Sequence, residues 1–238
     1  MTENPDIGKR AAALAALDFI KDGDLVGLGT GSTITYLLQA LNDRIKGGLQ
    51  IKGIPTSEET AKLATQFNIP LLPPEQSWNL HVAIDGADQV DPQYNLIKGG
   101  GGALLREKIV AYAAEKFVVL VDESKHVAAL GEPWAIPVEV TPFGWMNTAR
   151  LMETLGGIPK LRERGGNIFV SDNGNYIIDF QMGRIENPAI LESQLNNIPG
   201  VVENGLFVDR ASIVITGSSS GVKIEHQSPS FPSPSSPN

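Results

Sequence analysis

The sequence contains no cysteine in 238 residues, which excludes disulfides, zinc–thiolate sites and a cysteine nucleophile. It has only three histidines, His81, His126 and His226, and their spacing matches no metal-ligand pattern, so we expect no metal site. No apolar run approaches the length of a membrane span, and we expect no membrane partner. Residues 1–6 are acidic and polar, unlike a signal or transit peptide, which predicts a cytoplasmic protein.

Positive charge is also scarce, with 19 Lys and Arg against 27 Asp and Glu and a formal net charge of −8. A nucleic-acid-binding protein normally carries a basic patch or stripe. No window of this sequence is dense in lysine and arginine, so we expect no nucleic-acid partner. The length admits one large domain, or a large domain with a small one.

Short apolar segments alternate with helical periodicity through residue 125. The expected strands are 25–28, 49–54, 81–84 and 116–121. The expected helices are 6–19, 34–41, 58–67 and 103–114. This alternation predicts an α/β domain with a Rossmann-like, mostly parallel sheet and helices on both faces.

The pattern changes after residue 132. Strand, helix, two strands, helix and an extended segment are expected at 135–140, 142–155, 159–163, 176–180, 188–196 and 201–207. This βαββαβ order is typical of a ferredoxin-like α+β domain, and Asp-Asn-Gly-Asn at 172–175 is a hairpin signal. A strand at 211–216 then returns to the first domain. We therefore predict a Rossmann-like α/β catalytic domain (1–132 and 208–226), an inserted ferredoxin-like domain (133–207) and a disordered Pro/Ser tail (227–238).

Four consecutive glycines at 99–102 are the most distinctive segment. They offer no side chain and cost conformational entropy, so they indicate close approach of the backbone to something else. The helix that follows presents free N–H groups and the positive end of its dipole, which favour an anionic ligand. Lys98 precedes the glycines and Glu107 lies just inside the helix. The alternative is a flexible loop before a helix with a solvated charged face.

A second glycine-rich turn, Gly29-Thr-Gly-Ser-Thr33, joins the first strand to a helix. This arrangement favours a phosphate bound to backbone amides and hydroxyls. Ile34 occupies the third glycine position of a dinucleotide fingerprint and no Gly-Lys-Ser/Thr follows, so a monophosphate is the better interpretation. The alternative is a tight turn with an ordinary N-cap.

Polar residues follow the next strands as well. Asp85 and Asp88 come at the end of one, and Lys125 follows another. Ligands of open α/β sheets bind at the carboxyl ends of the strands, although turn-forming aspartates and a surface lysine are the alternative. With Glu107 as a base, and with Lys98 and the glycine amides as oxyanion partners, these residues suit proton abstraction next to the carbonyl of a sugar phosphate.

Four motifs, in this order, resemble ribose-5-phosphate isomerase, type A. They are Gly29-Thr-Gly-Ser-Thr33, Asp85-Gly-Ala-Asp88, Lys98-Gly-Gly-Gly101 with Ala103-Leu-Leu-Arg-Glu-Lys108, and Asp122-Glu-Ser-Lys125. The likeness continues through 138–140, 172–175 and 198–202, and it covers almost everything except the first few residues and the tail.

The resemblance implies interconversion of D-ribose 5-phosphate and D-ribulose 5-phosphate in the pentose phosphate pathway, through a cis-enediol and without metal or organic cofactor. It also implies a homodimer, or in some members a tetramer. Glu107 would be the base, Asp85 would open the sugar ring and shuttle a hydroxyl proton, and Lys98 would hold the oxyanion. The substrate-binding residues implied are Thr30, Gly31, Ser32, Thr33, Asp85, Gly86, Ala87, Asp88, Lys98, Gly99, Gly100, Gly101 and Lys125.

Two other functions stay open at this point. A sugar-phosphate-binding regulator or sensor would use the same phosphate grip and need no base, although such a protein normally carries a nucleic-acid-binding module. A sugar-phosphate deaminase or lactonase would normally use a histidine, and the three histidines lie away from the motifs.

Overall fold

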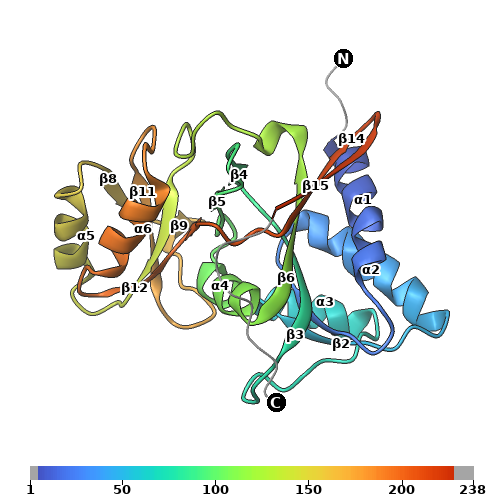
Figure 1. The fold of residues 1–238 in the computed structure, drawn as a ribbon. Helices are drawn as coiled ribbons and strands as arrows, with labels where there is room; N and C mark the ends of the chain where they lie inside the picture. The colour runs from blue at the N-terminus through green and yellow to red at the C-terminus, as the bar shows by residue number, and fades with distance from the viewer. Residues whose placement is uncertain (1–4, 228–238) are drawn as a thin grey trace, which may run out of the picture. The chain divides into compact units, whose positions relative to one another are not determined.

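The computed structural model describes residues 5–227 (Figure 1). They form two compact units: the first comprises 5–87, 106–125 and 209–227, and the second comprises 88–105 and 126–208. All but the first residue of the expected Pro/Ser tail, 227–238, lies outside the described residues.

A six-stranded sheet, in the order β15-β14-β6-β3-β1-β2, forms the centre of the first unit. Its strands are β1 (Leu25–Leu28), β2 (Lys52–Pro55), β3 (Leu80–Gly86), β6 (Ala114–Asp122), β14 (Ile213–Ser218) and β15 (Gly221–His226). The first five pair in parallel, and β15 pairs antiparallel with β14 at the edge. The expected Rossmann-like, mostly parallel sheet is thus confirmed.

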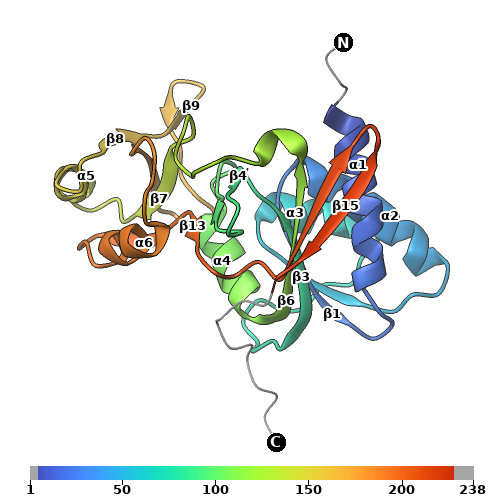
Figure 2. The same cartoon turned by 45° about the horizontal axis from the view of Figure 1, so that its top comes forward.

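Helices cover both faces of this sheet, with α1 (Pro5–Ala16) and α2 (Ser32–Lys46) on one face and α4 (Leu104–Tyr112) on the other (Figures 1 and 2). The short helix η1 (Leu17–Phe19) continues α1, and α3 (Glu58–Gln66) follows β2. Strands covered on both faces read as continuous apolar runs. In β6 five consecutive residues, from Phe117 to Val121, are buried. The apolar strand segments that alternate with helices in the sequence are therefore strands buried between two layers of helices.

The second unit contains a four-stranded antiparallel sheet in the order β12-β7-β11-β8. Its elements are β7 (Ile136–Val140), α5 (Trp145–Glu153), β8 (Ile158–Leu161), β11 (Tyr176–Gln181), α6 (Pro188–Asn196) and β12 (Val201–Asn204). This is the expected βαββαβ order. The expected start of the first helix at Pro142 is wrong, because Gly144 has a φ of 70° and caps α5 outside the helical conformation.

Several two-residue strands have no counterpart among the expected elements, because a strand this short shows no periodicity in sequence. The strands β13 (Leu206–Phe207), β5 (Leu96–Ile97) and β4 (Gln89–Val90) form a small sheet, and β9 (Glu163–Arg164) pairs with β10 (Asn167–Ile168). The small sheet belongs to the second unit. Residues 88–105 and 126–132 therefore lie in the second unit, whereas the expected boundary assigned them to the first.

Candidate active site

In the first unit, the polar motif residues follow the carboxyl ends of β1, β3 and β6. The register pairs Leu28 with Ile84, and Gly86 with Leu120, so these three parallel strands end at the same edge. Thr30 follows β1, Asp85 is the last residue but one of β3, and Lys125 ends the short helix η2 (Glu123–Lys125) directly after β6. The sheet topology therefore brings together residues that are far apart in sequence.

Asp85 is fixed at this edge by two main-chain donors. Asp85 is only 3% exposed. Its Oδ1 accepts hydrogen bonds from the N–H groups of Thr30 (2.9 Å) and Gly86 (2.7 Å). Only glycine fits at position 29, because a Cβ there would lie 2.1 Å from the Asp85 Oδ1. The first glycine-rich turn thus shapes the carboxylate site as well as opening a helix.

Glu107 is the second buried carboxylate of this edge. It lies in the first turn of α4, is 5% exposed, and lines the same small cavity as Asp85, Gly29 and Thr56. Two carboxylates lining one cavity in a largely apolar setting are typical of acid–base sites. The structure therefore places two of the expected catalytic residues together.

The C-terminal end of α4 is held by Arg210, which is 3% exposed. Its Nη2 donates to the main-chain carbonyls of Ala111 and Ala114, and its guanidinium lies over the Tyr112 ring at 5.4 Å. Burial lowers the pKa of Arg210 below its ordinary value. The Ala111 carbonyl lies in the last turn of α4 and the Ala114 carbonyl belongs to the first residue of β6. Because the last carbonyls of a helix carry the negative end of its dipole, the cation stabilises the helix that presents Glu107.

A candidate anion site lies at the start of α2. Gly31 has a φ of 110° and caps the helix, and it is exposed together with Ser32, while Thr33 is partly exposed. The first N–H groups of a helix have no carbonyl partner within it, and the helix dipole favours an anion there. This end of α2 offers amides and hydroxyls to a phosphate.

The Thr30 hydroxyl lies against a cluster of buried hydroxyls that the sequence pattern did not single out as a site. Thr30 Oγ1 hydrogen-bonds Thr56 Oγ1 (2.7 Å) and donates to Ser57 Oγ (3.0 Å), and Thr60 Oγ1 donates to the Gly29 carbonyl (2.8 Å). Ser57 also caps α3 by accepting the Thr60 N–H. The cluster fixes the loop after β1 to the loop after β2.

In the second unit, the glycine run forms a tight turn. The Gly102 N–H donates to the Gly99 carbonyl (2.9 Å), and the Gly100 N–H donates to Asp88 Oδ2 (2.8 Å). A Cβ at position 100 would lie 2.8 Å from the Asp88 carboxylate, so this approach again requires glycine. Within the described residues, the N–H groups of Gly99 and Gly101 donate to no protein acceptor.

Lys98 is one of the most buried charged residues, at 2% exposure. Its N–H donates to the Gly205 carbonyl (2.9 Å), and its Nζ lies 5.5 Å from the centre of the Phe207 ring. Both neighbours belong to the segment around β13, which the sequence pattern had read only as extended chain. Burying an ammonium group costs free energy unless polar or charged groups interact with it. The burial of Lys98 next to the glycine turn therefore marks it as a candidate functional residue.

The expected site residues therefore divide between the units. The first unit carries Thr30, Gly31, Ser32, Thr33, Asp85, Gly86, Ala87, Glu107 and Lys125. The second carries Asp88, Lys98, Gly99, Gly100 and Gly101.

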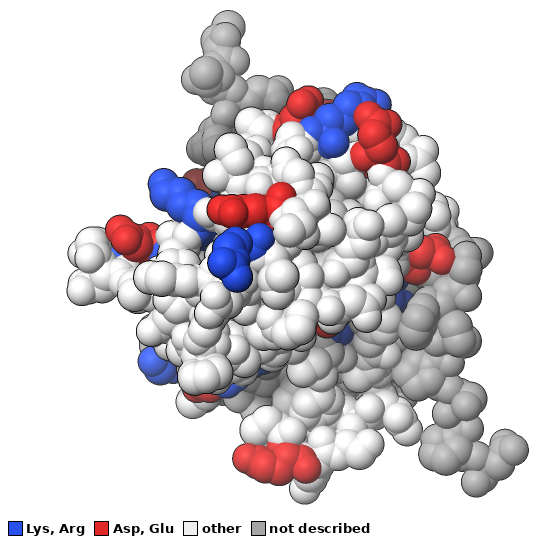
Figure 3. Space-filling model, turned by 90° about the vertical axis from the view of Figure 1, so that its left-hand side faces the viewer, with Lys and Arg blue, Asp and Glu red and all other residues white. Residues whose placement is uncertain are grey.

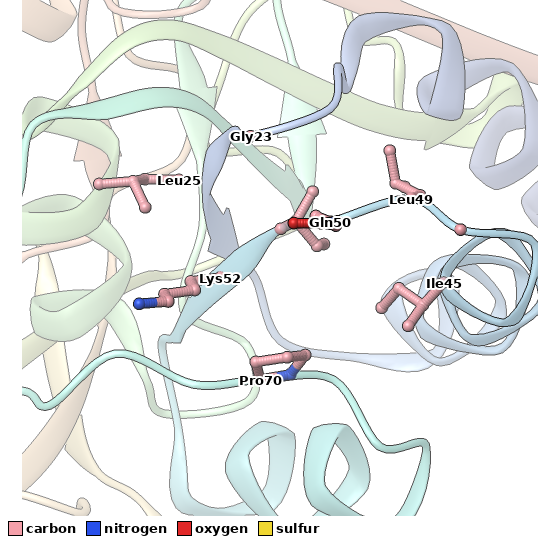
Figure 4. Close-up of a pocket in the computed structure, with 9 residues that line it drawn as sticks. Gly23, Leu25, Ile45, Leu49, Gln50, Lys52 and Pro70 are labelled. Carbon is pink, nitrogen blue, oxygen red and sulfur yellow. The ribbon is translucent and has the colours of Figure 1, made fainter.

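Other features of the described residues do not suit an active site. No group of three or more His, Cys, Asp or Glu side chains among them is arranged to hold a metal ion. A groove of about 680 Å³ in the first unit is lined by the first residues of β1 and β2, Leu25 and Lys52, with Ile45, Leu49 and Pro70 (Figure 4). It lies at the amino ends of these strands, opposite the edge where ligands of such sheets bind.

A doubly wound sheet with buried polar side chains at its carboxyl edge is typical of α/β enzymes. A family model described as "Ribose 5-phosphate isomerase A (phosphoriboisomerase A)" matches residues 52–221. A curated ribose-5-phosphate isomerase A of Thermomicrobium roseum is 46% identical over 222 residues, covering 92% of this chain and 94% of that protein.

Solved structures agree with this assignment. The ribose 5-phosphate isomerase A of Methanocaldococcus jannaschii superposes with a TM-score of 0.88 at 44% identity, covering 92% of this chain and 98% of that one. A D-ribose-5-phosphate isomerase in complex with phospho-erythronic acid superposes with a TM-score of 0.91 at 43% identity. This match covers 94% of this chain and 100% of that one. The chain belongs to the ribose-5-phosphate isomerase A family. None of the described helices is long and apolar enough to cross a membrane.

Proposed function

We propose that this chain interconverts D-ribose 5-phosphate and D-ribulose 5-phosphate in the pentose phosphate pathway, through an enediol(ate). One observation carries the proposal: Asp85 and Glu107 are both buried and line one cavity at the carboxyl edge of the sheet. An aldose–ketose isomerisation moves one proton between carbon atoms and another between oxygen atoms, so it needs two proton-transfer groups. Family membership supports the substrate.

Glu107 is proposed as the carbon base. Starting from the open-chain aldose, its carboxylate takes the proton from C2, the electron pair moves into the C1–C2 double bond, and O1 gains the negative charge. Asp85 moves a proton between the oxygens and assists ring opening. Glu107 then returns its proton to C1, which gives the ketose and restores the carboxylate. Burial of both groups supports this assignment, because a site that excludes bulk water protects a reactive enediolate.

Lys98 is proposed to stabilise the enediolate oxygen together with main-chain N–H groups of the glycine turn. The resemblance implied the amides of Gly99, Gly100 and Gly101, but the Gly100 N–H already donates to Asp88. The proposal therefore narrows to the amides of Gly99 and Gly101. Asp88, which the resemblance implied to be a substrate-binding residue, is proposed to orient the glycine turn.

The phosphate end of the substrate is proposed to bind the start of α2. Gly31, Ser32 and Thr33 supply amides and hydroxyls there, and Lys125 supplies a cation after β6. Thr30 supports the site by donating its N–H to Asp85. Gly86 and Ala87 are proposed to contact substrate through their main chain. No cofactor or metal is part of this proposal.

We also propose a homodimer in the cytoplasm. The side of the second unit that carries α5 and β8 is mostly uncharged (Figure 3), and Phe143, Met146 and Ile158 on or beside these elements are 94%, 69% and 71% exposed. Large exposed apolar patches mark protein–protein contacts. Light scattering of wild type and Met146→Glu tests this, and a monomeric wild type contradicts it. A cysteine-free chain suits a reducing compartment, and cell fractionation tests the location.

The function is tested by mixing the purified protein with ribose 5-phosphate in a chelator-containing buffer and following ketopentose formation. Glu107→Gln removes the base while keeping side-chain size, so the rate should fall by about 10²–10⁴-fold. Glu59→Gln makes the same chemical change at an exposed position of α3 and should leave the rate unchanged. Substrate binding without turnover by the folded wild type would instead favour the sensor function.

A further inference from the structure

Arg162 makes a set of contacts that its sequence position did not predict. It lies between β8 and β9 in the second unit, and its side chain is 12% exposed. Its Nη1 donates to two consecutive main-chain carbonyls, Gly99 O (3.0 Å) and Gly100 O (3.1 Å). A single guanidinium nitrogen thus bridges two peptide groups of the glycine turn.

The guanidinium is itself held in place by Asp179 of β11. Its Nε donates to Asp179 Oδ2 (3.0 Å) and its Nη2 donates to Asp179 Oδ1 (2.5 Å). This two-point pairing fixes the guanidinium plane, since the rigid fork matches the carboxylate. The ferredoxin-like sheet therefore presents a fixed cation to the carbonyl side of the glycine turn.

The consequence for the turn follows from peptide geometry. A trans peptide is planar, and its C=O and N–H point in opposite directions. The Gly99 carbonyl shares a peptide with the Gly100 N–H, which donates to Asp88. That peptide is held from one side by Arg162 and from the other by Asp88.

The next peptide is held from one side only. The Gly100 carbonyl accepts from Arg162, and it shares a peptide with the N–H of Gly101. Gly101 is exposed, and its N–H donates to no acceptor among residues 5–227. Arg162 therefore directs this N–H away from the guanidinium and toward solvent.

The same contact strengthens the donor. A cation at the carbonyl end polarises the amide, and hydrogen-bonded chains reinforce one another in this way. Glycines have no side chain to restrict the turn, so an unrestrained run would sample many conformations. Catalytic donors act best when they are oriented before the charge develops.

We propose that Arg162 is a positioning residue that orients and polarises the Gly101 amide as a donor to the oxyanion of the reaction intermediate. This inference rests on the proposed role of the glycine turn in the isomerisation. Arg162 acts through the turn, and Asp179 supports it.

Arg164 provides a matched control. It lies in β9, two residues further along the chain, and is exposed. Both arginines approach the Phe169 ring, Arg162 at 5.9 Å and Arg164 at 4.6 Å. No hydrogen bond joins Arg164 to the glycine turn among the described residues. The two positions thus share charge, ring contact and location, and they differ in the turn contact and in the Asp179 pairing and burial that accompany it.

The test compares Arg162→Lys, Arg162→Ala and Arg164→Gln in the full chain. Losing one oriented oxyanion donor lowers kcat by about 10²–10³-fold. Both Arg162 variants should approach this loss with KM changed less than about threefold, because the donor acts on charge that exists only in the intermediate. Arg164→Gln should match wild type, and thermal unfolding of each variant shows whether it is folded.

Added guanidinium ion, at a concentration that does not denature the wild type, should restore part of kcat to Arg162→Ala by filling the space beside Asp179. Asp179→Asn provides an independent variant that loosens the guanidinium and should lower kcat with KM retained. Folded Arg162 variants with wild-type kcat would overturn the proposal, as would equal losses in Arg164→Gln. Glu107→Gln in the same assay separates the two levels: if it is inactive while the Arg162 variants are fully active, the proposed function stands and only the role of Arg162 fails.

Discussion

Substitution of Gly29 by alanine should uncouple folding from catalysis, because the new methyl group meets the Asp85 carboxylate. The Cβ would lie 2.1 Å from Oδ1, whereas an ordinary contact begins at 3.4 Å, so the carboxylate must retreat by 3.4 − 2.1 = 1.3 Å. A misplacement of about 1 Å costs about 100-fold in rate. We therefore expect kcat of Gly29→Ala to fall by about 100-fold.

The same change should also lower stability, but not by enough to unfold the protein. Overpacking costs about 1–3 kcal/mol, and a weakened Thr30 hydrogen bond to the charged carboxylate adds up to about 1.5–3 kcal/mol. A domain with ordinary stability of about 5–15 kcal/mol remains folded. Urea denaturation measures this cost, and ketopentose formation at saturating substrate measures kcat.

Two further variants make this prediction decisive. Gly47→Ala alters a glycine of the same unit whose φ is −80° and whose nearest contact is 3.2 Å, so stability and rate should change little. Gly29→Ala in an Asp85→Ala background should cost less stability than in the wild type, because part of the clash is gone. A folded Gly29→Ala enzyme with wild-type kcat would refute the idea that the carboxylate position matters.

Three other outcomes follow from buried and paired charges. Arg210→Met removes the donor to the Ala111 carbonyl of α4 and to the Ala114 carbonyl of β6, and it should cost about 1–3 kcal/mol for each buried acceptor left unsatisfied, measured by urea denaturation. Glu139, whose Oε1 accepts three side-chain hydrogen bonds in the second unit, should tolerate glutamine better than alanine in thermal unfolding, because alanine removes the acceptor of all three bonds. The Arg106 hydrogen bond lowers the pKa of Glu58 below its ordinary value of 4.5, so its contribution to stability is present above that pH and is lost as the pH falls through the lowered value. Glu58→Gln should reduce the acid dependence of unfolding slightly at low salt and not at high salt, and an unchanged dependence at low salt contradicts this pairing.

The sequence predicted the elements with strong periodicity and clear end signals. The helix expected at 188–196 and the strand expected at 25–28 match α6 and β1 at both ends. Asn187 caps α6 with its side chain and Pro188 occupies its first turn, so the local signals and the tertiary structure agree. By contrast, β15 has an exposed residue at nearly every position, and no apolar pattern marks it.

Sequence alone could predict the site residues that carry a charge next to a glycine turn or a strand end. Asp85, Glu107 and Lys98 stood out because charged residues next to glycine turns and strand ends suggest chemistry, and all three are buried. Asp88 has the same sequence signal as Asp85, yet it holds the glycine turn. Thr56 and Arg162 belong to other segments of the chain, and only the folded structure shows that they contact Thr30 and Gly99. A long-range contact of this kind leaves no local trace in sequence.

The division of the chain between the two units has a consequence for its synthesis on the ribosome. The boundaries after residues 87, 105, 125 and 208 mean that the polypeptide passes from one unit to the other four times. The second unit is complete in sequence by residue 208, but β6 of the first unit pairs with β14, which is translated only afterwards. The nascent first unit must therefore keep an apolar strand edge unpaired until almost the whole chain has emerged, and such edges invite aggregation. Loss of the last 30 or so residues would leave that edge permanently open, so chaperone dependence and sensitivity to C-terminal truncation should be properties of the first unit.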